Sequence, residues 1–211
     1  MKTTSEPLPA KTLIIVTGGP GTGKSYTAHQ ILRAFPSLTS LSYDSIKEKE
    51  WDRFGFDNAA EKLRLNNFCL EEFYLILGAK MRQGQSLLIE YPFSHRHRDR
   101  LWELIRKYRY HAVTVLLEAD WSVVYKRFVS RNGRTDRHPG HLTDCYHKGD
   151  PIPEGSLSAA PLTYEEFRAD IDSKLYDIRL GNSVYVAVTD FTTVHYPEMI
   201  KKIRRAAEPA E

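Results

Sequence analysis

The sequence lacks several features that would assign it to a class at once. Its 211 residues include only two cysteines, and no N-terminal stretch combines basic residues with a long apolar run before a small-residue cleavage site. The longest apolar runs, such as SLLI and VTVLL, are strand-sized and fall short of the roughly 18 to 20 residues that cross a bilayer. These absences predict a soluble protein of a reducing, cytoplasmic compartment.

A large excess of charge is also missing. Thirty basic and 27 acidic residues leave a formal charge of +3, which demands neither a nucleic-acid nor a membrane partner. With 41% hydrophobic and 27% charged residues, the composition is that of an ordinary globular chain, and the length suits one domain. Residues 1–10 are rich in Thr, Ser and Pro and are expected to form a flexible tail, so residues 11–211 are predicted to form a single domain.

Short apolar runs recur along that domain and alternate with helical patterns. Helical spacing of apolar residues follows in 25–35, 58–82 and around 101–108. The runs expected to form strands are TLIIVT (12–17), SLTSLSY (37–43), SLLIE (86–90), AVTVLLEA (112–119) and SVYVAV (183–188). Strands that alternate with helices predict an α/β fold, with a parallel sheet covered on both faces.

A phosphate-binding loop follows the first run. Residues 18–25, GGPGTGKS, match G-x-x-x-x-G-K-[ST] and lie between a predicted strand and a predicted helix, where this motif belongs. Glycines let backbone N–H groups turn toward phosphates, Lys24 is expected to reach the β- and γ-phosphates, and Ser25 offers its hydroxyl to Mg²⁺. The sequence therefore predicts an ATP- and Mg²⁺-binding site.

Two signatures that would give this loop another role are absent. There is no N-K-x-D sequence to recognise guanine, which argues against a GTPase, and no LSGGQ-type sequence, which argues against a transporter ATPase. The chain is also too short for a motor with a separate helical lid domain. The role that remains for this loop is phosphoryl transfer from a nucleotide to a small or polymeric acceptor.

Carboxylates follow the other predicted strands. Asp44 ends the second, Glu90 the third and Asp120 the fourth, and ligands of parallel α/β sheets bind at these carboxyl ends. Asp44 is the candidate base for an attacking hydroxyl, with helix capping as the alternative. Glu90 is expected to order Mg²⁺ through a water or to hold the acceptor, whereas Asp120 is expected to cap a helix.

A basic segment lies farther along the chain. Arg127 and Arg131 share one helix face, and Arg134 and Arg137 follow in a stretch rich in Gly and Pro. This pattern predicts a lid over residues 127–163 that closes on polyphosphate, with a solvated basic face as the alternative. The histidines and the cysteine of the same stretch match no standard zinc spacing.

The stretch SHRHRDR (94–100) places cations, among them Arg96, near the N-terminus of a predicted helix. The helix dipole disfavours cations there, and an anionic acceptor nearby would offset that cost. Ordinary solvent exposure is the competing explanation.

Taken together, GGPGTGKS, YDSIKE, LLIEYPF and the segment R-x-x-x-R…RHPGH resemble the small P-loop kinases, which include zeta toxins, chloramphenicol phosphotransferase, gluconate kinase and the kinase domain of polynucleotide kinases. The resemblance spans roughly residues 12–190. It implies a three-layer P-loop NTPase fold with strand order 2-3-1-4-5, ATP- and Mg²⁺-dependent transfer to a hydroxyl, Asp44 as base, and arginines at the phosphates. It also places the acceptor against a helical region, 46–82.

One departure from that family concerns the acceptor pocket. In many relatives the residue after the third-strand glutamate is small, whereas Tyr91 and Pro92 follow Glu90 here. The expected activity is an ATP-dependent transfer to a hydroxyl of a small molecule, with anionic molecules among the candidate acceptors. The alternatives are a polynucleotide 5′-hydroxyl kinase and a nucleotide-bound switch without transfer.

The sequence thus predicts three groups of site residues. Those assigned to catalysis are Lys24, Asp44, Arg127 and Arg131. Those assigned to the nucleotide are Gly19, Pro20, Gly21, Thr22, Gly23, Lys24, Ser25, Tyr26, Arg127 and Arg131. Those assigned to the acceptor are Asp44, Trp51, Arg53, Glu90, Arg96 and Arg137, and those assigned to Mg²⁺ are Ser25 and, through a water, Glu90.

Overall fold

A computed structural model describes residues 7–132, 137–151 and 163–208. The first half of this part holds β1 (Thr12–Thr17), α1 (Lys24–Ala34), β2 (Thr39–Ser42), α2 (Tyr43–Phe54), α3 (Ala59–Arg82), β3 (Leu87–Glu90), the 3₁₀ turn η1 (His95–His97) and α4 (Arg98–Tyr108). The second half holds β4 (His111–Glu118), α5 (Trp121–Asn132), η2 (Pro139–His141), α6 (Tyr164–Lys174), β5 (Asn182–Ala187), η3 (Phe191–Thr193) and α7 (Tyr196–Ala207).

The strands form one parallel sheet in the order β2-β3-β1-β4-β5, which confirms the expected topology. The central strand β1 is buried along its whole length and pairs with β3 on one side and β4 on the other, so that Ile14 lies beside both Leu88 and Val113. Strands buried on both faces are typical of parallel sheets with helices on each side. All five strands therefore end at the same edge of the sheet.

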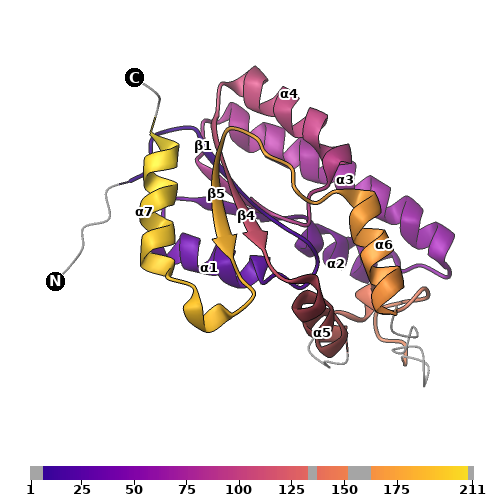
Figure 1. Ribbon diagram of the computed structural model, residues 1–211. Helices are drawn as coiled ribbons and strands as arrows, with labels where there is room; N and C mark the ends of the chain where they lie inside the picture. Colours follow the sequence, from indigo (N-terminus) through magenta and orange to yellow (C-terminus); the bar gives the residue numbers. More distant parts are fainter. Residues whose placement is uncertain (1–6, 133–136, 152–162, 209–211) are drawn as a thin grey trace.

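Helices cover both faces of the sheet (Figure 1). Alternate residues of β1 point to opposite faces: Leu13 and Ile15 pack into a core with α2, α3 and α4, whereas Ile14 and Val16 pack into a core with α1 and α7. A smaller cluster joins α5 to α6 through Val124. The result is the three-layer arrangement that the sequence predicts.

The helical region 46–82 is two helices. Helix α2 ends at Gly55, whose φ of 65° is a left-handed conformation that favours glycine, and Asn58 then caps α3 by accepting from the Glu61 N–H. Helices α2 and α3 pack against each other beside the carboxyl ends of β2 and β3. This break gives the site a short helix, α2, that starts directly at the end of a strand.

The expected lid is only partly within the described residues. Helix α5 continues through Arg131 to Asn132, and residues 137–151 lie against α2 and the start of α3. Residues 133–136, which include Arg134, and residues 152–162 lie outside the described residues, as do residues 1–6 of the expected tail.

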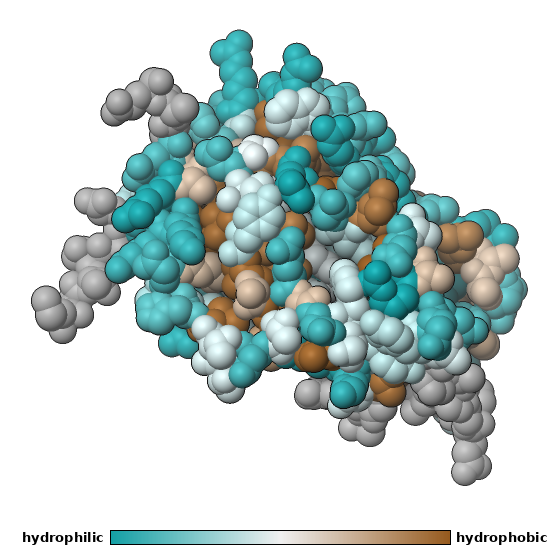
Figure 2. Space-filling view, viewed as in Figure 1, coloured by the Kyte–Doolittle hydropathy of each residue, from teal (hydrophilic) through white to brown (hydrophobic). Residues whose placement is uncertain are grey.

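Polar side chains dominate the face shown in Figure 2, and hydrophobic side chains reach the surface between them over the β5 edge of the sheet. Tyr185 of β5 is among the large hydrophobic residues that are exposed. Within the described ranges, no helix combines the length and the hydropathy needed to span a lipid bilayer.

Candidate active site

The phosphate-binding loop joins β1 to α1 and is closed on itself. The Lys24 Nζ donates to the carbonyl oxygens of Gly18 and Gly19, at 3.1 and 2.8 Å, and the Thr22 hydroxyl donates to Gly19 O at 2.9 Å. Gly23 has a φ of 83°, and a Cβ added there would lie 2.8 Å from the Phe191 ring, so this position requires glycine. Helix α1 starts at Lys24 without a side-chain cap, which leaves first-turn N–H groups for an anion.

The charges beside the loop fit a phosphate and a divalent cation. Burial, together with the charge of Arg131, lowers the pKa of Lys24 to about 8, although Glu90 and Asp44 oppose this shift. Burial raises the pKa of Glu90, and a hydrogen bond from the Ser25 side chain and the charge of Lys24 act in the opposite direction. A hydroxyl beside a carboxylate is an oxygen donor set suited to Mg²⁺. Ser25 and Glu90 could therefore hold this ion together with phosphate oxygens.

Asp44 lies in the first turn of α2, at the end of β2. Its Oδ1 accepts from the Lys47 Nζ at 2.6 Å. Burial alone would raise the pKa of the Asp44 carboxyl, but the charge and hydrogen bond of Lys47, with smaller contributions from His141 and Lys24, lower it below its ordinary value. Asp44 is thus a carboxylate at neutral pH.

The alternative that Asp44 caps this helix is wrong. Ser42 is the N-cap residue of α2, and its hydroxyl accepts from the Ser45 N–H at 3.4 Å. At the end of β4, by contrast, the expected cap is confirmed, because Asp120 Oδ1 accepts from the Ser122 N–H at 2.8 Å. Asp44 instead lies in the first turn of α2, where its carboxylate pairs with Lys47.

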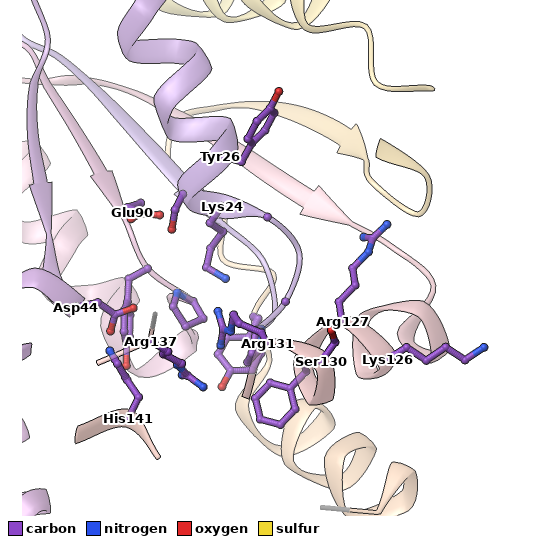
Figure 3. A pocket seen from close by; sticks show the side chains of 18 of the residues that line it. Lys24, Tyr26, Asp44, Glu90, Lys126, Arg127, Ser130, Arg131, Arg137 and His141 are labelled. Carbon is purple, nitrogen blue, oxygen red and sulfur yellow. The ribbon is translucent and has the colours of Figure 1, made fainter. Parts of the chain in front are cut away.

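A cavity of about 880 Å³ joins the loop to Asp44. Figure 3 shows Lys24, Asp44, Arg131 and His141 turned toward this common space. A neighbouring cavity of about 770 Å³ shares several of its walls with the first. The shared residues are Ser25, Asp44, Glu90, Arg131, Arg137 and His141.

The arginines of the basic segment occupy different places. Arg131 and Arg137 line both cavities, and Arg137 donates to the Asn132 side chain. Burial, followed by the charge of Arg131, lowers the pKa of Arg137 to about 10, so it remains a cation at neutral pH. Arg127 lines only the larger cavity, and Figure 3 shows its side chain directed away from Lys24.

Arg127 is held on the far side of the phosphate loop. Its guanidinium donates to Val188 O at 2.6 Å and to Thr189 O at 2.7 Å, and its Cζ lies 3.9 Å from the centre of the Phe191 ring. Tyr26, whose ring packs edge-on against Tyr196, lies on the same side. The two arginines that the sequence groups together thus face different parts of the cavity.

The wall opposite the loop comes from residues 137–151, here termed the docked segment. Its histidines His138, His141 and His147 meet Asp52, Glu48 and Asp57, at 3.1, 2.8 and 2.7 Å respectively. Asp52 also accepts from the Tyr146 hydroxyl at 2.6 Å and from Lys148 at 2.7 Å. Backbone hydrogen bonds of 2.9 and 2.8 Å pair Phe56 with Tyr146.

The docked segment contributes residues to the walls of both cavities. Gly140 packs so closely on the Trp51 indole that a Cβ there would lie 2.4 Å from it. Burial keeps the pKa of His141 well below its ordinary value, so this ring is neutral beside Glu48. The docked segment therefore contributes a neutral imidazole, the cation Arg137 and a rigid turn to the wall.

Three residues assigned to the acceptor lie outside both cavity linings. Trp51 is 1% exposed and donates its indole N–H to Asn66 Oδ1 at 3.0 Å. Arg53 pairs loosely with Glu50 at 3.7 Å, and the Arg96 Nε donates to His97 at 3.3 Å. The assignment of these three residues to the acceptor stays a prediction.

Lys47, His141, Tyr176 and Phe191 line the larger cavity, and none of them is predicted from the sequence. Lys47 lies three residues after Asp44, a spacing that places both on one face of a helix and could have signalled the pair. His141 lies in a stretch whose histidines match no metal motif, and only the fold brings it next to Asp44. No sequence signal marks Tyr176 or Phe191.

Residues 13–144, more than half of the chain, match the family described as AAA domain, and the protein belongs to this family. No curated protein matches the sequence significantly. The family assignment and the strand order together define a P-loop NTPase of the α/β class.

Solved structures show the same fold over nearly the whole chain. A candidate kinase from Chloroflexus aurantiacus has a TM-score of 0.73 and 23% identity, covering 94% of this chain and 99% of that chain. A gluconokinase from Sinorhizobium meliloti has a TM-score of 0.53 and 17% identity over 93% and 91%. A tunicamycin resistance protein from Deinococcus radiodurans has a TM-score of 0.52 and 14% identity over 95% and 97%. The fold is that of small P-loop kinases.

Proposed function

We propose that the protein is an ATP-dependent phosphotransferase that moves the γ-phosphoryl group of ATP to a hydroxyl of a small molecule. One observation carries the proposal: a lysine of a phosphate-binding loop and an ionised carboxylate at the neighbouring strand end face the same cavity. A nucleotide-bound switch needs the lysine but has no use for a carboxylate placed to receive a proton. The kinase fold of the related structures supports the same reaction class.

In this proposal the loop and its neighbours bind the nucleotide. The first-turn N–H groups of α1 receive the phosphates, and the Lys24 ammonium exchanges its bonds to Gly18 O and Gly19 O for the β- and γ-phosphate oxygens. Arg127, Tyr26 and Phe191 lie where the nucleoside part would lie. Mg²⁺, when bound, neutralises charge on the phosphates.

Asp44 and Arg131 then act on the transferred group. The acceptor oxygen forms a bond to the γ-phosphorus, the bond from that phosphorus to the β,γ-bridging oxygen breaks, and ADP leaves with the electron pair. The acceptor hydroxyl gives its proton to the Asp44 carboxylate. Arg131 donates to the equatorial oxygens, where charge is spread in the loose transition state.

The acceptor binds, in this proposal, between α2 and the docked segment. The smaller cavity there, of about 770 Å³, has the size of a small-molecule pocket, and the docked segment forms one of its walls. Polar residues predominate among those that line it, with Ser42, Ser45, Glu48 and His138 beside the shared residues. Such a wall favours an acceptor that offers several hydrogen-bonding groups over one that is largely apolar.

The lid proposed for residues 127–163 has two parts in the described residues. The end of α5 carries Arg131 toward the phosphates, and the docked segment forms the acceptor wall. We propose that residues 46–82 bind the acceptor through α2 rather than α3, because the residues of this region that line the two cavities all belong to α2.

The test is a screen for ADP release with Mg·ATP against hydroxyl-bearing metabolites, antibiotics and 5′-hydroxyl oligonucleotides, followed by the Asp44→Asn variant. With the best acceptor, turnover by this variant should fall roughly 10²- to 10⁴-fold, because the amide cannot take the proton. ATP affinity should hold. A folded Asp44→Asn protein that turns over at the wild-type rate would remove Asp44 from catalysis, and activity confined to oligonucleotides would make the protein a 5′-end kinase.

A further inference from the structure

Lys47 lies in a place where lysines are rare. The residue is 8% exposed, and its Nζ lies 5.0, 5.2 and 5.3 Å from the ring centres of Tyr43, Trp51 and Tyr91. Lysines ordinarily keep the ammonium group in water, because burial of an unpaired charge is costly. A buried lysine between three rings therefore needs a compensating partner.

That partner is the carboxylate of Asp44. The Nζ lies 2.6 Å from Asp44 Oδ1, a short charge-assisted hydrogen bond. Both residues line the larger cavity, but the Lys47 side chain is only 10% exposed, whereas the Asp44 side chain is 45% exposed. The lysine is thus the enclosed member of the pair, and the carboxylate is the member presented to a ligand.

The rings around Lys47 are themselves fixed. The Tyr43 hydroxyl donates to Asn66 O at 2.6 Å, and the Trp51 indole N–H donates to Asn66 Oδ1 at 3.0 Å. The Tyr43 and Tyr91 rings pack edge-on at 4.6 Å. Cation–π attraction to these rings adds to the ion pair. The ammonium group therefore has little freedom to leave Asp44.

Other charges face Asp44, and the nucleotide would take several of them. The charged and titratable groups around this carboxyl are Lys24 of α1, Tyr43 and Glu48 of α2, Glu90 of β3 and Tyr91 directly after it, Arg131 of α5, and Arg137 and His141 of the docked segment. In the proposed function, Lys24 and Arg131 bind phosphates, whose negative charge opposes the ionisation of Asp44. Lys47 is enclosed and stays with the carboxylate.

We propose that Lys47 is a positioning residue, which fixes Asp44 Oδ1 and keeps the carboxylate ionised so that Oδ2 faces the acceptor hydroxyl. The catalytic part of this inference rests on the proposed kinase activity, whereas the control of Asp44 by Lys47 does not. Lys47 lines the larger cavity, but its ammonium group is engaged by Asp44 and the surrounding rings, so in this proposal it acts through Asp44 rather than on the nucleotide or the transferred group. Its loss should act on Asp44, and through Asp44 on turnover.

Three variants test this inference. Lys47→Met keeps an unbranched apolar side chain among the rings and removes the charge, and Lys47→Arg restores a charge in the same place. Lys49→Met is the matched control, because Lys49 lies on the same helix, is 72% exposed in its side chain and pairs with Glu50 instead. Circular dichroism and thermal melting show which variants keep the fold.

The first measurement is a ¹³C NMR titration of the Asp44 carboxyl in the nucleotide-free protein, which needs no turnover. The carboxyl should titrate at higher pH in Lys47→Met than in the wild type, and at an unchanged pH in Lys49→Met. Lys47→Arg should return the titration toward that of the wild type. An Asp44 titration that is the same in the wild type and Lys47→Met overturns the inference.

The second measurement is the pH profile of turnover with the best acceptor. Lys47→Met should lower kcat on the order of tenfold at pH 6, with partial recovery as the pH rises, because alkali ionises Asp44 without the lysine. The KM for ATP should change less than about twofold. A raised acceptor KM with normal kcat would overturn the positioning role in favour of direct acceptor binding.

Different results would contradict the proposed kinase function and the proposed positioning role of Lys47. If the NMR titration shifts as expected but no acceptor is phosphorylated by the wild type, the control of Asp44 by Lys47 is supported and the kinase function is wrong. If acceptors are phosphorylated and Lys47→Met keeps the wild-type pH profile, the kinase function is supported and the positioning role is wrong.

Discussion

The two ends of the active-site cavity are built in different ways. At the phosphate end, consecutive residues of one loop and the first turn of α1 supply the main groups, many of them from the backbone. At the acceptor end, α2, the end of β3 and the docked segment supply side chains that lie far apart in sequence. A local motif can be recognised by its spacing, whereas a pocket assembled from distant segments depends on how those segments pack.

The two ends also differ in how strongly each depends on single residues. At the phosphate end, positions such as Gly23 have backbone conformations that residues other than glycine rarely adopt. The acceptor end is held by hydrogen bonds between histidines of the docked segment and carboxylates, each of modest strength. Changes at the phosphate end should therefore abolish the proposed reaction, and changes at the acceptor end should weaken it by degrees.

The largest effect is expected for Lys24→Ala at the phosphate end. Turnover should fall by at least about 10³-fold, because the charge that reaches the β- and γ-phosphates is lost. The fold should survive, since the hydrogen bonds of the Lys24 Nζ go to carbonyls of the loop itself. ADP release and a thermal melt measure the two effects, and wild-type turnover by the variant would contradict the assignment of the loop.

The next largest effect is expected for Arg131→Ala, and it should differ in kind from the effect of Arg127→Ala. Arg131→Ala should lower kcat on the order of 10²- to 10³-fold with little change in ATP binding, because in the proposed reaction its guanidinium donates to the transferred group. Arg127→Ala should instead raise the KM for ATP, because this side chain lies with Phe191 on the far side of the loop. Steady-state kinetics of both variants test the difference. Equal losses of kcat would mean that both arginines act at the phosphates.

A smaller effect is expected for Asp52→Asn at the acceptor end. The variant weakens the bonds that Asp52 accepts from Lys148, Tyr146 and His138, and these bonds keep the pKa of Asp52 far below its ordinary value. The KM for the acceptor should rise roughly three- to tenfold, with ATP binding and kcat nearly unchanged. Glu71→Gln, which disturbs the exposed pair with Arg100, is the control. An unchanged acceptor KM would show that docking at Asp52 does not shape the pocket.

The smallest effect concerns pH and the outermost pair, His147 with Asp57. The hydrogen bond and charge of Asp57 raise the pKa of His147, so docking gains from this pair below the ordinary histidine pKa and loses the gain as the pH rises through the raised value. NMR titration should show a His147 pKa above its ordinary value, and Asp57→Asn should lower this pKa back toward the ordinary value. Asp57→Asn should lower the melting temperature slightly at pH 6 and not at pH 8. A His147 pKa that Asp57→Asn leaves in place would contradict the pairing.

Much of the fold was predictable because its signals are local. The apolar runs predicted all five strands within a few residues, and the strand order implied by the family resemblance is confirmed. Helix α6 was not predicted, although Thr163 and Glu166 form a capping box that the spacing T-x-x-E signals. The start of α3 agrees with the helical pattern that begins at residue 58, although a single glycine such as Gly55 is by itself an ambiguous signal of a break.

The site was predictable where its residues belong to a local motif, end a strand or lie in the basic segment, as Arg131 and Arg137 do. The loop around Lys24 and the strand-end Asp44 and Glu90 were named from sequence, and the structure brings them to one cavity. Trp51 was named for the acceptor, but its indole is buried and bonded to Asn66. An aromatic residue near a site has the same sequence signal whether it packs inward or faces a ligand, and tertiary packing alone decides between the two.

The arrangement of α2 has a consequence for how such an enzyme could change its substrate during evolution. Asp44, Glu48 and Asp52 recur at every fourth residue of one helix, so the proposed base and the anchors of the docked segment share a single support. The groups that meet these anchors come from a segment without long helices or strands, and connecting segments of this kind generally tolerate substitution better than the elements they join. Substitutions within residues 137–151 could thus adapt the cavity to a new acceptor while the carboxylates of α2 stay the same.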